Sequence, residues 1–318
     1  MTVFAAIQRI PTPIAGLALG IASLGFCLDG RFGFSGALAL VTALISSLLL
    51  LGLVAKFSSK PALLKEDLSH AVVGSVLPTS AMAMMVIAAS IHGQWPLVAN
   101  VLWPVAVALH LIFLSAFAYH RSQQALWMHM VPSWFVPPVG IIVAAVTCPE
   151  PMFAPVATAL LYLGMVAYAV LLPMMLYRLI FHPNIVEPAK PTIAIMAAPA
   201  SLSLAGYLNM VSDPSPLVVV VLLGIAILMT SVVYVAFFHL LKLPFSPGYA
   251  AFTFPMVIGA TAMYQCAALA ERWGLELSSQ LHQIGDIELL VATLVVGYVA
   301  FRYAHAYRPR FKASLQQA

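Results

Sequence analysis

Charged side chains are scarce in this chain. Asp, Glu, Lys and Arg together make up 8% of its 318 residues, whereas hydrophobic residues make up 63%. An ordinary soluble domain carries roughly 25% charged residues, so these few charges cannot cover the surface of a fold in water. The composition excludes a soluble globular protein and predicts an integral membrane protein.

Short segments of alternating polarity are also missing, and this excludes a transmembrane β-barrel. The apolar runs are continuous over about 20 residues, which is the length of a membrane-spanning helix. We therefore expect an all-α fold in one transmembrane domain covering residues 1–318. The ten expected spans are 11–28, 34–57, 70–91, 96–120, 133–148, 152–181, 189–211, 215–241, 248–270 and 285–307.

The few charges alternate between the two sides of these spans. Twelve of the fourteen Lys and Arg residues fall on one side, and the other side has only Arg31 and Arg272. By the positive-inside rule both termini are cytoplasmic, and we expect a multi-pass protein of the inner (plasma) membrane. The net charge of +4 then marks topology and gives no indication of nucleic-acid binding. The acidic residues on the poorly basic side are Asp29, Glu150, Asp213, Glu271, Glu276, Asp286 and Glu288.

A helix-breaking residue recurs in every second span, at separations of 62, 60, 61 and 56 residues. Such a period predicts five repeated helical hairpins. We expect the first helices of the hairpins to form an inner ring of five kinked helices around a pore, surrounded by an outer ring of five. Chance placement among 23 prolines is the alternative. The recurring residues are Gly16, Pro78, Pro138, Pro199 and Pro255.

The odd-numbered spans lack Asp, Glu, Lys, Arg and His over residues 16–28, 72–90, 133–147, 191–211 and 249–270. Proton-coupled carriers and cation channels usually place ionisable groups at membrane depth. Hydroxyls and the positive ends of broken helices could instead hold an anion weakly. A hydroxyl bonded to its own helix backbone is the alternative in each case. The hydroxyls close to the breaks belong to Thr79, Ser80, Ser201, Ser203 and Thr253.

The ninth span contains the candidate gate. Pro255 removes a backbone donor in the middle of this apolar run, a break tolerated in lipid only where protein or a water-filled cavity covers it. Helical spacing places Ile258 and Thr261 on the same face as Phe254. We predict that Phe254 plugs a pore, and a core aromatic packed between two helices is the alternative. The candidate pore-lining or kink residues are Gly16, Gly20, Leu77, Pro78, Thr79, Pro138, Pro199, Leu202, Pro255, Ile258 and Thr261.

Motifs for catalysis, metals and cofactors do not occur in the sequence. The nine histidines have no HExxH or paired-ligand spacing, and there is no Walker loop, GxSxG or dinucleotide fingerprint. We therefore expect neither an enzyme nor a bound metal or cofactor. For the three cysteines, we expect the role of small buried hydrophobic residues.

Four stretches resemble a known family. In their order along the chain they are similar to the tellurite-resistance/dicarboxylate transporter family, which includes bacterial tellurite-resistance protein A and the plant guard-cell slow anion channels. The resemblance implies a homotrimer with one pore in each protomer, closed by a phenylalanine that Phe254 matches. Gly16 matches a glycine of the family's first helix. The stretches are PTPIAGLALGIASL at 11–24, VPSWFVPPVGIIVAA at 131–145, AAPASLSLAGYL at 197–208 and AFTFPMVIGATA at 251–262.

Two functions stay open at this point. The leading interpretation is a channel passing small inorganic anions such as chloride or nitrate, with membrane lipid as its surroundings. The alternative is a secondary carrier that exports a dicarboxylate or an oxyanion such as malate, sulfite or tellurite. A dicarboxylate carrier would be expected to offer a fixed Arg or Lys at mid-membrane, and none occurs in the odd-numbered spans.

Overall fold

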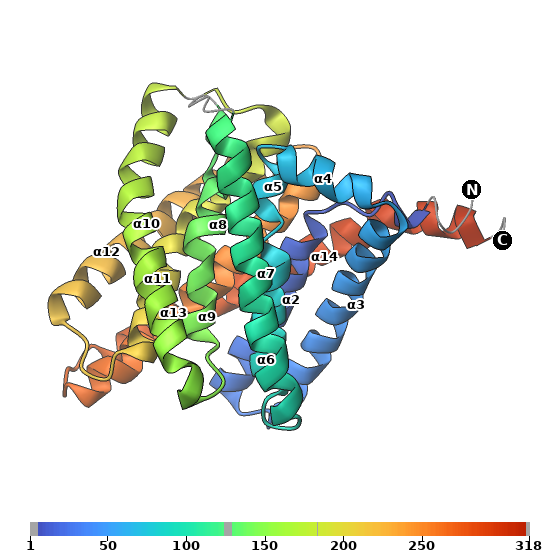
Figure 1. Ribbon diagram of the computed structural model, residues 1–318. Helices are drawn as coiled ribbons and strands as arrows, with labels where there is room; N and C mark the ends of the chain where they lie inside the picture. Colours follow the sequence, from blue (N-terminus) through green and yellow to red (C-terminus); the bar gives the residue numbers. More distant parts are fainter. Residues whose placement is uncertain (1–5, 124–128, 183, 316–318) are drawn as a thin grey trace.

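The computed structural model describes residues 6–123, 129–182 and 184–315 (Figure 1). Within these ranges the regular structure is helical and no strand occurs. Nine helical runs there are long and apolar enough to cross a membrane, and Pro132–Val146 is a tenth, shorter apolar run. The expected all-α integral membrane fold is confirmed, whereas the count of ten spans stays a prediction.

Continuous helices form the second member of each predicted hairpin. Their apolar stretches are mostly exposed, with 28 to 39% of the most apolar window buried. Pro104 and Pro173 lie inside two of them without ending the helix. These helices are α3 (Ala37–Ser59), α7 (Pro96–Gln123), α10 (Ala154–Phe181), α12 (Pro216–Leu240) and α14 (Ser278–Leu315).

The first members of the hairpins are mostly broken into short segments. They are α2 (Ile14–Phe32); α5 (Val73–Val76) with α6 (Thr79–Ile91); the 3₁₀ turn η2 (Pro132–Phe135) with α8 (Val136–Val139), η3 (Gly140–Ile142) and α9 (Val143–Val146); η5 (Glu187–Ala197) with α11 (Ala198–Met210); and η6 (Pro247–Phe252) with α13 (Thr253–Arg272). Two short elements, α4 (Pro61–Ser69) and η4 (Pro151–Phe153), lie in connections.

Burial separates the two sets of helices. In the four long runs of the first set, 61 to 78% of the most apolar window is buried, about twice the share in the second set. Lipid solvates apolar side chains about as well as a protein interior does, so an apolar helix can remain exposed to lipid. The high burial of the first set therefore indicates that these segments are surrounded by protein. The difference favours an inner and an outer layer, and the closed ring of five stays a prediction.

The prolines act differently from the kinks that we predicted from sequence. Pro199 and Pro255 stand in the first turn of α11 and α13, directly after 3₁₀ segments. First-turn N–H groups have no partner within their helix, so proline costs little there. Each proline therefore begins an α-helix and does not bend a continuous one. Gly16 differs from the rest, because it lies in the unbroken helix α2.

Close contact between α2 and α13 depends on a glycine. A Cβ atom added at Gly20 would collide with the Thr253 side chain. Thr253 Oγ1 hydrogen bonds to the carbonyl oxygens of Gly16 at 3.0 Å and Ala250 at 2.8 Å. The Thr253 hydroxyl thus joins two buried segments through backbone carbonyls, and Gly20 leaves the space that this contact needs.

Charged groups tie the ends of α2, α13 and α14 together. Arg31 Nε and Nη2 donate to the two carboxylate oxygens of Asp286 at 2.8 and 3.0 Å. Tyr264 donates to Asp286 Oδ1 at 2.8 Å. Asp29 caps the start of α3 by accepting from the backbone N–H groups of Gly36 and Ala39. These acidic residues therefore serve as structural anchors.

Glu288 corrects one prediction from the charge pattern. We placed it in an outer connection, but α14 begins at Ser278, about seven residues before the predicted span. Glu288 is only 6% exposed, and a Cβ atom added at Gly259 of α13 would lie 2.5 Å from its Oε2 atom. The longer helix carries this carboxyl into the interface between α13 and α14.

Two glycine substitutions test the helix packing. Gly20→Ala should lower the free energy of unfolding by about 1–3 kcal/mol, because the added methyl group overpacks a filled contact. Gly224→Ala in α12 is the control, since a Cβ atom there meets nothing within 4 Å. The control should be neutral or stabilising by up to about 1 kcal/mol through helix propensity. Thermal unfolding in detergent measures both, and equal effects would contradict the close contact.

Candidate functional site: a central passage

A cavity of about 80 Å³ lies between the inner segments. The first member of each of the five predicted hairpins contributes to its lining. Among the lining residues are Gly16, Thr79, Gly140, Pro199 and Phe254. A cavity bounded by all five inner segments is the space that the predicted pore would occupy.

A second cavity of about 20 Å³ is bounded by the same five segments. Its lining includes Ser23 of α2, Val86 of α6, Thr147 beside α9, Leu202 of α11 and Thr261 of α13. Thr79 and Met82 line the first cavity, whereas Val86 lines the second, one turn farther along α6. The two cavities therefore follow one another along the inner helices.

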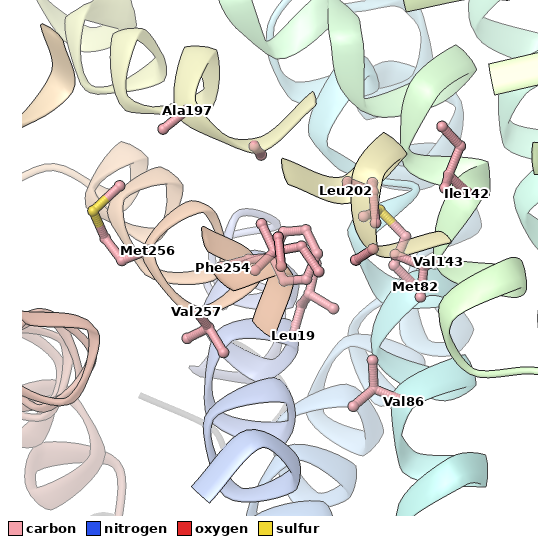
Figure 2. Packing of buried hydrophobic residues seen from close by; sticks show 14 of the residues in the cluster. Leu19, Met82, Val86, Ile142, Val143, Ala197, Leu202, Phe254, Met256 and Val257 are labelled. Atoms are coloured by element: carbon pink, nitrogen blue, oxygen red, sulfur yellow. The ribbon is translucent and has the colours of Figure 1, made fainter. Parts of the chain in front are cut away.

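Phe254 and Leu202 are the two residues that line both cavities. Figure 2 shows the Phe254 side chain next to Leu19, with Leu202 and Met82 across from it. Phe254 is 8% exposed, and this residual exposure agrees with empty space on both of its sides. The passage is thus interrupted by two apolar side chains from α13 and α11.

The lining of both cavities is almost entirely apolar. Their described walls contain no Asp, Glu, Lys, Arg or His. A group of three or more His, Cys, Asp or Glu side chains that could hold a metal ion is not found in the described part of the chain. The passage therefore offers a permeant molecule hydroxyls, backbone groups and apolar surface.

The structure brings most of the predicted pore residues to this passage. Leu202, Phe254 and six other predicted residues come from spans far apart in the sequence. The predicted residues that line the first cavity are Gly16, Thr79, Pro199, Leu202, Phe254 and Pro255. The predicted residues that line the second are Leu202, Phe254, Ile258 and Thr261.

Four predicted residues lie outside both linings. Gly20 packs against Thr253, and Leu77 is 1% exposed. The remaining two, Pro78 and Pro138, stand at the breaks of the third and fifth spans without lining either cavity.

The break in the fifth span is covered from outside the passage. His110 of α7 is fully buried, and its Nε2 atom lies 2.8 Å from the carbonyl oxygen of Pro137. Because a carbonyl oxygen only accepts, the imidazole donates in this bond. An outer helix therefore supplies the partner for a carbonyl at this break.

Most of the predicted anion-holding hydroxyls bond to backbone carbonyls, which is the alternative stated from sequence. Thr79 bonds to Val76 at 2.6 Å and Ser80 to Leu77 at 2.7 Å. Ser201 bonds to Ala197 at 3.2 Å. The exception is Ser203, whose buried Oγ has no partner in the described residues. Hydroxyls near a break mainly secure the backbone.

Sequence reasoning missed Ser23, which lines the second cavity. The helical spacing of α2 indicated Ser23, because Leu19 one turn earlier and Gly16 two turns earlier line the first cavity. We weighed only hydroxyls close to helix breaks, and α2 has no break. The unbroken helix therefore hid a residue of the passage.

The chain is similar to a known protein family and to two proteins named as transporters. Residues 10–304 match the family model described as voltage-dependent anion channel. An uncharacterized transporter of Methanocaldococcus jannaschii is 27% identical over 218 residues, covering 60% of this chain and 62% of its own length. A second uncharacterized transporter of that organism is 26% identical over 222 residues, with 60% and 63% covered. The chain spans less than two thirds of the length of these curated relatives.

Proposed function

Because the chain belongs to the voltage-dependent anion channel family, we propose that its central passage is an anion-conducting pore gated by Phe254. This family membership confirms the resemblance of the four sequence stretches to the tellurite-resistance/dicarboxylate transporter group. The family is one of channels and transporters, which agrees with the expectation that the chain is not an enzyme. The proposed permeant ions are small inorganic anions such as chloride and nitrate.

The observation that carries this proposal is the position of Phe254 on both cavities. An apolar constriction blocks ions because it offers nothing in exchange for their hydration shell. Phe254 stands on α13, and Leu202 lines the same two cavities from α11. A rotation of the phenylalanine side chain would join the cavities without moving a helix.

The absence of fixed charge favours a channel over a carrier. A dicarboxylate carrier would be expected to hold its substrate with Arg or Lys inside the passage. The described walls of both cavities contain neither. The two relatives are named as transporters, which supports a carrier as the alternative. Its substrate would be a dicarboxylate or an oxyanion such as malate, sulfite or tellurite.

Phe254→Ala tests the gate. The variant should stay folded, since the ring borders cavities on two sides, and its anion current in planar bilayers should rise at least about tenfold as the dry constriction widens. Current carried by anions alone, shown by the reversal potential in a salt gradient, supports a channel. Strict exchange of one anion for another without net current would support the carrier instead.

Phe252→Ala is the matched control on the same segment. Phe252 is fully buried and packs against Tyr249 and Phe237 with ring centroids 4.8 and 5.4 Å away. Its truncation should destabilise by about 3–5 kcal/mol without raising current. A monodisperse Phe254→Ala protein that conducts no more than the parent would rule out Phe254 as the main barrier.

We also propose that both termini lie in the cytoplasm of a cell whose inner (plasma) membrane holds the protein. The support is the excess of Lys and Arg on one side of the predicted spans. A cysteine introduced at Ala318, with Cys27, Cys148 and Cys266 replaced by alanine, should resist impermeant thiol reagents in intact cells. Labelling of this cysteine from outside the cell would contradict the cytoplasmic placement of the termini.

A homotrimer is the assembly that we propose, on the resemblance to the family alone. One protomer has a mass of 34.0 kDa. Native mass spectrometry of the detergent-released protein should therefore give a mass three times that of the protomer. A single-protomer mass in mild detergent, at protein concentrations where the fold is intact, would contradict the proposal.

A further inference from the structure

The second cavity has room for one small particle. Its volume of about 20 Å³ exceeds the ~10–15 Å³ that a single water molecule requires. A halide ion without its hydration shell is comparable in size to a water molecule. The cavity adjoins Phe254 and Leu202, so a particle in it would rest directly against the constriction.

Ser23 is the unusual polar group of this cavity. It lies on α2 and is 7% exposed, and its Oγ atom has no hydrogen-bond partner in the described part of the chain. A buried hydroxyl without a partner costs free energy. The cost is removed when an acceptor enters the cavity.

The other two hydroxyls of the cavity have no proton to offer. Thr261 donates to the carbonyl oxygen of Val257 at 3.1 Å. Thr147 donates to the carbonyl oxygen of Val143 at 2.7 Å and accepts from the Trp103 indole at 3.2 Å. Since a hydroxyl carries one proton, Ser23 is left as the hydroxyl donor free to bind an acceptor here.

We propose that the second cavity is a single-ion site, in which the Ser23 hydroxyl donates to a partly dehydrated monovalent anion beside Phe254. This inference rests on the proposed anion channel. A divalent cation is usually held by several oxygen ligands that include a carboxylate, and the described wall contains no carboxylate. A single neutral donor holds an anion weakly, so the ion can leave again. Water is the competing occupant.

The experiment compares variants in the Phe254→Ala protein, whose open passage gives measurable current. Adding Ser23→Ala should raise the chloride concentration for half-maximal conductance about tenfold, which is the usual scale for one hydrogen bond to a charged group. It should also change the nitrate-to-chloride permeability ratio. Ser90→Ala is the control, because Ser90 of α6 is buried, lines neither cavity and already donates its proton to the Val86 carbonyl oxygen at 2.9 Å. It should change the half-saturating concentration less than about twofold.

A binding measurement accompanies the currents and does not require conduction. Chloride should raise the melting temperature of the Ser90→Ala protein in a saturable way, compared with the large anion gluconate at equal ionic strength. The same titration on Ser23→Ala should need about tenfold more chloride. Monodisperse chromatography and a cooperative melting transition without chloride establish that each variant is folded.

Each outcome decides between the interpretations. Unchanged half-saturation and permeability in Ser23→Ala would overturn the site and leave water as its occupant, while the current of Phe254→Ala would still support the channel. Equal losses in Ser23→Ala and Ser90→Ala would overturn the assignment to Ser23. A folded Phe254→Ala protein without anion current would overturn the channel and the site together.

Discussion

Within a bilayer, every backbone N–H and C=O group needs a partner inside the protein. Because most of the inner helices are broken, other segments of the chain must supply partners for the backbone groups at the breaks. The exposed carbonyls are covered by groups from neighbouring segments. His110 of α7 approaches the Pro137 carbonyl at the break in the fifth span. The Gly16 carbonyl, although it lies in the unbroken α2, also accepts from Thr253 of α13. The outer helices are therefore needed to seal the inner ones as well as to face lipid.

Such sealing works only where helices come close. Gly20 gives Thr253 its room, and Gly259 gives room to the buried Glu288 carboxyl. In lipid, helices gain little from hiding apolar side chains, so packing contact and hydrogen bonds hold them together. Small residues on α2 and α13 thus determine how narrow the passage between these helices can be.

The sequence was sufficient for the class of fold, and most of the residues proposed for the pore border the two cavities. Apolar length and the spacing of Pro78, Pro199 and Pro255 are local properties, so they could be recognised in the sequence without knowledge of tertiary contacts. Partners contributed by other segments could not be recognised in this way. The burial of Glu288 depends on where α14 begins, and the partners of the hydroxyls depend on neighbouring carbonyls. Ser23 was missed because we weighed only hydroxyls close to helix breaks, and α2 has no break. That its Oγ atom has no partner among the described residues depends on tertiary contacts.

Two phenylalanines of the ninth span, Phe252 in η6 and Phe254 in α13, have different surroundings. Phe252 lies among Tyr249 and Phe237, away from the axis, where aromatic contacts stabilise the junction of η6, α12 and α13. Phe254 follows two residues later and borders both cavities. In a helix, residues two apart point in different directions, so one segment can supply a packed anchor and an obstruction with empty space beside it.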